Sequence, residues 1–520
     1  MRTLQKIGLI IFIIGITIFT FSPFIGSYKV TDDILKTGLS EQQYANLSKK
    51  LNEKLVGQTF SFAWQISSVF VNEYELKNEE FKSKEEWDKV MYDNPQEVAL
   101  SLTKSSATGF YATNILLFFL LSFGFGVLGA IMYFLPDVIL LGPPGIKNNH
   151  IYRRPSTNRG LIAYFVFAYL IGFYILLYFY PAQLTNQILL VDPLSLLLNG
   201  NPASRWFLYG VLYCTVMLTM GVRMYIKYRN NKYQIFRTTS VLFFQVAFAF
   251  LIPELLIRFN MPSMDFKNAW PLNYSFFFDW NIDNLLNSGA IGAFMLFWGI
   301  VLTLIIVPVF SYFYGKRWYC SWVCGCGGLA ETLGDPYRQH SNKTLKAWKF
   351  ERWIVHGVLV FAVVMTGAAL YTFFTNQNTL LGIDTYSIQK AYGFLIGSIF
   401  AGVIGTGFYP IFGNRVWCRF GCPLAAYIGI IQRFKSRFRI TTNGGQCISC
   451  GNCSTYCEQG IDVRWYAQRG ENIVRASCVG CGVCSAVCPR GVLKLENGPE
   501  QDRIIENPII IGNDGIKLNL

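Results

Sequence analysis

Two stretches near the C-terminus decide the fold: CISCGNCSTYC at residues 447–457 and CVGCGVCSAVCP at residues 478–489. Both have the spacing Cys-x2-Cys-x2-Cys-x3-Cys, which is typical of a pair of [4Fe–4S] clusters. Three thiolates spaced two residues apart can surround one corner of a cubane, so the fourth ligand must come from elsewhere in the fold. The sequence therefore predicts iron–sulfur sites in this part of the chain.

The order of the ligands follows from the same spacing. In two-cluster ferredoxins the fourth Cys of each run ligates the other cluster. The predicted ligands are Cys447, Cys450, Cys453 and Cys488 for one cluster, and Cys478, Cys481, Cys484 and Cys457 for the second. Zinc sites usually show well-separated Cys-x2-Cys pairs rather than runs of four, and disulfides are disfavoured in a reducing compartment. Glu458 stands where a Pro often follows the fourth Cys, which we interpret as a difference in turn geometry.

A second cysteine pattern repeats within the chain. GKRWYCSWVC at 315–324 and GNRVWCRFGCP at 413–423 share the form Gly-x-Arg-x-aromatic-Cys-x3-Cys, offset by 98 residues. Two residues four apart lie on one helix face, so two such pairs could supply four thiolates. We predict a metal or redox site at the membrane edge, formed by Cys320, Cys324, Cys326, Cys418 and Cys422.

The same repeat places an Arg three residues before each first Cys. Arg317 and Arg415 are expected beside these thiols, where positive charge lowers a thiol pKa. The alternative is that these Cys residues simply pack helix ends. Cys214, alone in an apolar stretch, is expected to be a packing residue.

The composition is that of a membrane protein. Of 520 residues, 52% are hydrophobic and 15% charged, against about 25% charged in soluble domains. Eight stretches approach the roughly 20 apolar residues that a membrane span needs. They lie at about 7–27, 111–135, 160–180, 206–222, 240–257, 289–313, 353–374 and 392–412. The predicted fold is an all-α multi-pass membrane protein of about eight transmembrane helices, with a small C-terminal α+β ferredoxin-like domain.

Positive charge predicts the orientation of these spans. The loops that share a side with the N-terminus carry eighteen Lys and Arg, and the opposite short loops carry four. Since Lys and Arg favour the cytoplasmic side, the N-terminus and the ferredoxin domain are predicted to face the cytoplasm of a bacterial inner membrane. The net charge of +14 is then mostly a topology signal, and no nucleic-acid partner is expected.

Four regions follow from this topology. They are an uncleaved N-terminal anchor (1–27), an extracytoplasmic and mainly helical segment (28–110), a transmembrane core (111–412) and a cytoplasmic tail (413–520), whose ferredoxin domain covers about 440–500. In the loop before the sixth span, Trp270, Tyr274 and Trp280 are expected at the membrane interface, where aromatic side chains gather.

These motifs resemble those of the membrane polyferredoxins that include the NapH, NosR and CcoG (RdxA/FixG) proteins. The resemblance covers roughly residues 150–500, and its specific part is 313–490. It implies a multi-span core, two Cys-x3-Cys-Pro motifs at cytoplasmic helix ends, a C-terminal pair of [4Fe–4S] clusters, and respiratory electron transfer or respiratory-enzyme maturation. The first motif departs from the family pattern, because Cys-Gly-Cys stands where Cys-Pro is usual. NosR-type proteins attach a flavin to a Thr in Ser-Gly-Ala-Thr; here SSATG at 105–109 lacks that Gly, so a flavin at Thr108 is not expected.

Two functions remain open at this level. One is an electron relay between the cytoplasmic clusters and a quinone pool or a respiratory partner subunit. The other is a maturation factor that reduces a metal such as copper for an oxidase. A solute transporter is a third possibility, supported only by Glu254 within the fifth span. His150, His340 and His356 are the only three His residues, and they do not form the facing pairs that membrane haem needs.

Overall fold

The computed structural model describes residues 2–140, 157–443, 446–497, 511–512 and 515–516. The chain forms two compact units. Unit 1 contains residues 1–140, 169–223 and 254–260, and unit 2 contains residues 141–168, 224–253 and 261–520. Unit 2 therefore holds every Cys except Cys214. His150 lies outside the described residues.

Eight helices in the described part of the chain are long and apolar enough to cross a membrane. They are Thr3–Phe24, Ile115–Pro136, Leu161–Phe179, Arg205–Lys227, Lys232–Arg258, Gly289–Tyr314, Leu345–Thr375 and Thr385–Gly407. Each corresponds to one predicted span. The fourth and fifth are longer than hydropathy suggested, because Lys227 and Lys232 lie in the helix ends. Long basic side chains can extend toward the interface from such positions.

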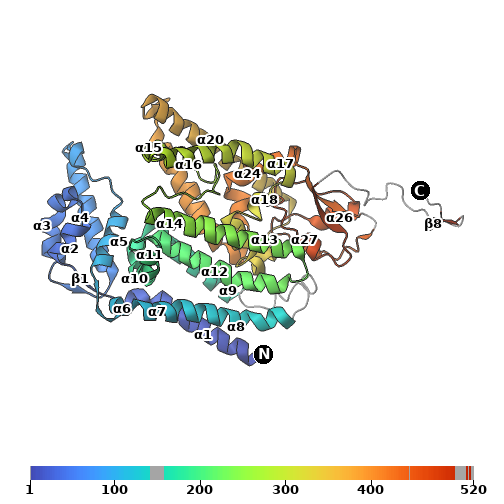
Figure 1. Cartoon of the computed structure of the whole chain (residues 1–520), viewed down its shortest axis with the longest axis horizontal. Coiled ribbons are helices and arrows are strands. Elements are labelled where there is room, and N and C mark those ends of the chain that lie inside the picture. The colour runs from blue at the N-terminus through green and yellow to red at the C-terminus, as the bar shows by residue number, and fades with distance from the viewer. Residues whose placement is uncertain (1, 141–156, 444–445, 498–510, 513–514, 517–520) are drawn as a thin grey trace. The chain divides into compact units, whose positions relative to one another are not determined.

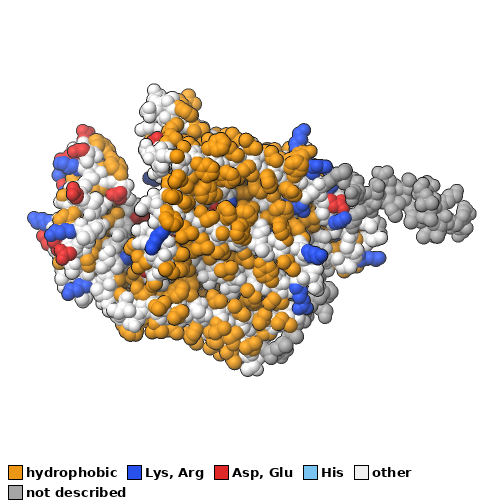
Figure 2. All heavy atoms as spheres, viewed as in Figure 1, with side chains coloured by type: hydrophobic (Ala, Val, Ile, Leu, Met, Phe, Trp, Pro, Cys, Tyr) orange, Lys and Arg blue, Asp and Glu red, His pale blue; other side chains and the backbone are white. Residues whose placement is uncertain are grey.

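The long helices of unit 2 present an apolar surface. Hydrophobic side chains cover these helices in Figure 2, and Lys and Arg gather at the end that carries the ferredoxin domain. Phe297 and Leu304 in the sixth span are 64% and 66% exposed. Exposed apolar patches of this kind mark contact with something other than water, and in helices of this length that indicates lipid.

Unit 1 combines helices with a small sheet (Figure 1). The helices of its charged segment are α2 (Asp32–Gly38), α3 (Glu41–Leu55), α4 (Ala63–Ser83) and α5 (Pro95–Ser105). The strands β1 (Ser27–Lys29), β2 (Thr59–Phe60) and β3 (Ala107–Thr108) pair antiparallel in the order β2-β1-β3. Leu47, Leu51 and Leu55 recur every four residues in α3 and are buried, so one face of α3 forms the core of this segment.

In unit 2 the loop between α14 (Ile252–Arg258) and α15 (Asp279–Asn287) is folded into the helical core. The Tyr319 hydroxyl donates to the Lys267 carbonyl at 2.9 Å, and Trp270 Nε1 donates to the Thr366 hydroxyl at 2.9 Å. Trp270 and Tyr274 are half-buried, whereas Trp280 is 57% exposed. Their location at the membrane interface stays a prediction.

The C-terminal domain of unit 2 is a small α+β fold. Strands β6 (Phe438–Thr442) and β7 (Leu493–Asn497) pair antiparallel, and three short helices lie between them: α25 (Asn452–Thr455), α26 (Val463–Arg469) and α27 (Val483–Ala486). The residues before α25 and α27, Gly451 and Gly482, have φ values of 78° and 71°. Gly adopts this left-handed conformation without steric cost, so each Cys run can wrap closely around its short helix.

Candidate functional site

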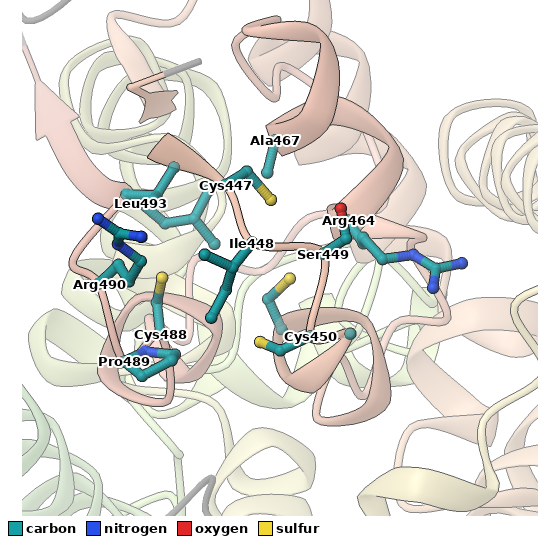
Figure 3. A pocket seen from close by; sticks show the side chains of 13 residues that line it. Cys447, Ile448, Ser449, Cys450, Arg464, Ala467, Cys488, Pro489, Arg490 and Leu493 are labelled. Atoms are coloured by element: carbon teal, nitrogen blue, oxygen red, sulfur yellow. The ribbon is translucent and has the colours of Figure 1, made fainter. Parts of the chain in front are cut away.

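One pocket of this domain brings together thiols from both Cys runs (Figure 3). Its lining includes Cys447, Cys450 and Cys453 of the first run, and also Cys488, the last Cys of the second run. Burial and the three neighbouring thiols raise the pKa of Cys453 to about 12. The four residues assigned to the first cluster from spacing alone thus lie around one space.

A second group of thiols mirrors the first. Burial, followed by repulsion from Cys481, Cys478 and Cys457, raises the pKa of the Cys484 thiol well above its usual value. Such repulsion requires proximity, so Cys457 of the first run lies among the thiols of the second. The Ile461 backbone N–H donates to Cys457 Sγ at 3.4 Å. The thiols are therefore grouped as the crossed assignment expects, and the ligation itself stays a prediction.

Both groups suit iron–sulfur clusters chemically. Metal ligation requires thiolates. Burial and mutual repulsion oppose ionisation of these thiols unless metal cations bind between the sulfur atoms. Around a single zinc ion, four sulfurs at about 2.3 Å from the metal would be only about 3.8 Å apart. No three His, Cys, Asp or Glu side chains in the described residues are placed to hold one metal ion. Four Cys residues per group, supplied by two runs of this spacing, are the ligand set of a [4Fe–4S] cluster.

The two groups differ in their surroundings. Cys450 is exposed and Cys447 is partly exposed, whereas Cys478 and Cys484 are buried. Side chains from the helical part of unit 2 bind the loop 478–481. Tyr233 and Arg237 of α13 (Lys232–Phe243) donate to the carbonyls of Gly480 and Cys481 at 2.7 and 2.6 Å. Ser321 and Gln432 donate to the carbonyls of Val479 and Cys478 at 2.8 and 2.7 Å. The second group therefore faces the helical core, and the first faces solvent.

The repeated Cys pairs also converge. Cys324, Cys418 and Cys422 belong to one buried cluster of unit 2. Cys320 is buried near Cys324 and Cys418, and Cys326 shares a hydrogen bond with Cys324. That hydrogen bond lowers the pKa of Cys324 despite its burial. The five predicted residues therefore come together, while the metal itself stays a prediction.

The pairs do not lie on continuous helices, contrary to the expectation from their spacing. In the first copy α18 (Arg317–Cys320) ends before Cys324, which caps the N-terminus of α19 (Gly325–Glu331). In the second copy Cys422 caps the N-terminus of α24 (Pro423–Phe434), where its Sγ accepts from Ala425 N–H at 3.4 Å. A helix N-terminus favours negative charge, and the pKa of Cys324 is lowered. At Cys422 burial outweighs the Ala425 N–H and raises the pKa well above its usual value.

The two predicted arginines behave differently. Arg415 Nη1 donates to Cys418 Sγ at 3.7 Å and to the Cys320 carbonyl at 3.3 Å. Arg317 instead lies over the rings of Phe438 and Trp322, at 4.9 and 5.3 Å from their centroids. The expectation for Arg317 is therefore wrong: aromatic faces offer its guanidinium a cation–π environment. Arg415 is the arginine beside the repeated thiols.

A buried charge network joins the ferredoxin domain to the Cys repeats. Its members are Lys227, Arg237, Arg338, Arg415, Glu331, Asp335 and Glu458, each with a side chain at most 8% exposed. Glu458 is central, because its two carboxylate oxygens lie 2.8 Å from Arg338 and 2.8 Å from Arg415. Arg338 also pairs with Asp335 at 2.9 Å, and Arg415 with Glu331 at 2.8 Å.

Sequence reasoning missed this network. It treated Glu458 as a change of turn geometry, whereas the side chain is fully buried and ion-paired. Burial alone would raise the pKa of Glu458, but Arg338 and Arg415 outweigh it and hold the pKa below its usual value. The available signal was chemical: a carboxylate directly after a cluster Cys, in a buried position, requires a cation.

The remaining candidates from the sequence have other surroundings. Cys214 is buried in unit 1, as expected of a packing residue. Glu254 accepts from Asn199 at 2.5 Å in unit 1. His340 is buried in unit 2, and His356 contacts the Arg352 carbonyl within its own helix. Thr108 is exposed in β3 and its hydroxyl donates to the Ser27 carbonyl at 3.2 Å.

Comparison with known families agrees with this geometry. A family described as a 4Fe–4S binding domain matches residues 295–344 and 392–441, and each segment contains one copy of the Cys repeat. A family described as a 4Fe–4S dicluster domain matches residues 439–489, which contain both Cys runs. No solved structure matches the chain.

Individual relatives are more distant. MauN of Methylobacillus flagellatus, a methylamine utilization ferredoxin-type protein, is 28% identical over 159 residues, which are 30% of this chain and 53% of that protein. MauN of Methylorubrum extorquens is 26% identical over 209 residues, 39% of this chain and 66% of the relative. YccM of Escherichia coli, whose name assigns it to electron transport, is 26% identical over 170 residues, 28% and 43% of the two chains. The chain spans about half the length of the curated relatives it matches. It therefore carries 4Fe–4S binding domains and is homologous to ferredoxin-type electron-transport proteins.

Proposed function

We propose that this protein is a membrane-bound electron relay between two cytoplasmic [4Fe–4S] clusters and a quinone pool or a respiratory partner. The clusters would be held by the two crossed groups of Cys residues. The four regions expected from the sequence, a bacterial inner-membrane location and a cytoplasmic ferredoxin domain belong to this proposal. So does kinship with the NapH, NosR and CcoG branch. A [4Fe–4S] cluster would supply reversible one-electron chemistry, which the protein tunes through burial and hydrogen bonds.

One observation carries this proposal. Cys457 of the second thiol group is followed by Glu458, which pairs with Arg415 at 2.8 Å, and Arg415 in turn contacts Cys418 at 3.7 Å. A set of contacts thus runs from the buried thiol group of the ferredoxin domain to the thiols of the Cys repeat, and the first thiol group of the same domain faces solvent. An order of this kind is what a relay between solution and membrane requires.

We infer a further metal or iron–sulfur site at the Cys repeat. Trp417 Nε1 and the Tyr392 hydroxyl belong to the same buried cluster as Cys418 and Cys422. Among the described residues neither group has a hydrogen-bond partner. Buried donors of this kind call for an acceptor, and thiolate or sulfide sulfur bound to metal would be one.

Iron and acid-labile sulfide counts on anaerobically purified protein, with EPR of the reduced state, test both statements. About eight irons per chain would support the two ferredoxin clusters, and a higher count would support metal at the repeat. The control is a variant with Cys320 and Cys418 replaced by Ala, which should return a higher count to about eight. An iron-free preparation with zinc on the Cys runs would contradict the relay.

The second candidate function is a maturation factor that reduces copper. Cys324 and Cys326 share a hydrogen bond, so two soft ligands lie side by side, and thiolates select Cu(I). In that reaction Cu(II) gains one electron and a reduced cluster loses it. The test is Cu(II) reduction by dithionite-reduced protein freed of reductant. Cys326→Ser should abolish the Cu(I) product under this function, and Cu(I) formation that equals that of the wild type would contradict it.

A further inference from the structure

The open side of the first thiol pocket carries a basic and aromatic surface. We call it the docking patch and define it by Ile448, Cys450, Arg464, Trp465 and Arg490. Ile448 and Trp465 are 54% and 43% exposed, and both arginines are exposed. Of the described residues that line the pocket, Arg464 and Arg490 are the only charged ones. Figure 3 shows them on opposite sides of the exposed thiols.

We propose that this patch docks a small acidic electron-transfer protein, an inference that rests on the proposed relay. Trp and Arg are enriched where proteins bind one another. Opposite charge speeds the encounter of two proteins, and redox pairs commonly use small, transient interfaces. The patch combines these features at the side of the ferredoxin domain where a thiol reaches solvent.

Nearby acidic groups cancel only part of this positive charge. Glu471 lies 3.6 Å from Arg469, so these two charges balance each other at the edge of the patch. Asp462 accepts from the Ser454 hydroxyl at 2.6 Å and keeps its negative charge, which Arg464 and Arg490 together outweigh. The side chains of the patch are therefore net positive and complement an anionic surface.

Two alternative roles explain the docking patch less well: balancing the charge of a bound cluster, and binding a lipid surface. Arginines that only balanced the charge of a bound cluster would not need exposed Trp and Ile side chains beside them. A lipid surface would meet the inner ends of the spans. In Figure 1, α26, which carries Arg464 and Trp465, lies on the side of the ferredoxin domain away from α13 and α17 (Val307–Tyr314). The occupant favoured by these observations is an acidic protein.

The test uses full-length protein in lipid nanodiscs, loaded with iron anaerobically, and an acidic flavodoxin as the probe. Binding of the oxidised flavodoxin, which transfers no electron, is measured by biolayer interferometry at several salt concentrations. Electron transfer is measured separately by stopped flow. There the anionic flavin hydroquinone loses one electron to become the neutral semiquinone, and one oxidised cluster gains that electron.

We expect binding that weakens as salt rises, because charge complementarity is screened. The double variant Arg464→Glu and Arg490→Glu should weaken binding about tenfold or more and flatten the salt dependence. The control Lys435→Glu and Arg437→Glu, which changes the charge equally at two exposed positions outside the pocket, should stay within about twofold. Equal binding by the double variant and the wild type would overturn the proposal. So would tight binding of the patch to phosphatidylglycerol vesicles without binding of flavodoxin.

The relay and the docking patch fail in different ways. Protein without iron, or with iron that dithionite cannot reduce, would contradict the relay itself. Protein with clusters that dithionite reduces, but that does not bind flavodoxin, would contradict only the docking patch.

Discussion

Replacing Glu458 by Gln should release the ferredoxin domain from the Cys repeats. The substitution keeps the shape of the side chain and removes the charge that lies 2.8 Å from both Arg338 and Arg415. Removing one partner from a buried ion pair costs about 3–5 kcal/mol, because a desolvated charge is left behind. Arg338 keeps Asp335 and Arg415 keeps Glu331, so we expect the lower end, about 3 kcal/mol.

Hydrogen exchange followed by mass spectrometry measures this loss directly. At about 1.4 kcal/mol per factor of ten, peptides that contain residues 414–418 and 457–463 should lose about a hundredfold of their protection. The matched control is Glu471→Gln, because Glu471 is 49% exposed and its pair with Arg469 is longer, at 3.6 Å. Exposed pairs of this kind contribute about 0–1 kcal/mol.

The outcome shows whether Glu458 holds the ferredoxin domain against the Cys repeats or only shapes the turn after Cys457. Glu458→Asp keeps the charge and should recover part of the protection, whereas Glu458→Pro restores the usual ferredoxin residue and should not. If Glu458→Gln and Glu471→Gln exchange at the same rates as the wild type, the ion pairs of Glu458 do not hold the domain, and the reasoning fails.

Three further predictions follow from the same contacts. Cys488→Ala should remove the cluster of the first run, and Cys457→Ala should remove the cluster of the second run. Each variant should lower the iron content from about eight to about four per chain. Two identical EPR spectra would contradict the crossed assignment. Cys214→Ala should leave the iron count unchanged, because that thiol belongs to neither Cys run and to neither copy of the Cys repeat, and a loss of iron would be the contrary result. Burial, and then Arg159, lower the pKa of His340 to about 4. Between pH 6.5 and 4 the unfolded chain therefore binds more protons at this residue than the folded chain does. The free energy of unfolding should fall as pH falls through that range, by up to about 1.4 kcal/mol per pH unit. His340→Gln should lack this component in urea unfolding curves at pH 5 and 7, and an equal pH dependence in both proteins would contradict it.

The parts of this molecule that sequence could predict are those with a local cause. The spacing of a Cys run constrains how its thiols can surround one cluster, so the run from Cys447 and the run from Cys478 could be paired from their spacing. Long apolar stretches likewise predicted the eight spans. The repeat around Cys320 and Cys418 was visible because the chain carries two copies of one motif.

The parts that sequence could not predict depend on distant partners. Arg237, Glu331 and Arg415 are separated by up to 178 positions, and nothing in their neighbouring residues indicates that they pair. Trp270 belongs to a loop whose composition gives no sign of a partner, yet its ring nitrogen donates to Thr366, 96 positions away. Arg317 and Arg415 occupy equivalent motif positions, yet Phe438 lies beside only the former.

The buried charge network has a consequence for the order of the redox sites. Apolar residues of similar volume often stabilise a protein as well as buried ion pairs do, so stability alone does not explain seven buried charges. The network holds four cations and three carboxylates, an excess of positive charge between two groups of thiols. If metal binds at both groups as proposed, thiolates would carry negative charge on both sides of the network, and a carboxylate placed directly after Cys457 would fix the distance between them. A pair of sites that must exchange electrons needs such a fixed spacing, whereas a ferredoxin domain tethered for storage or regulation does not.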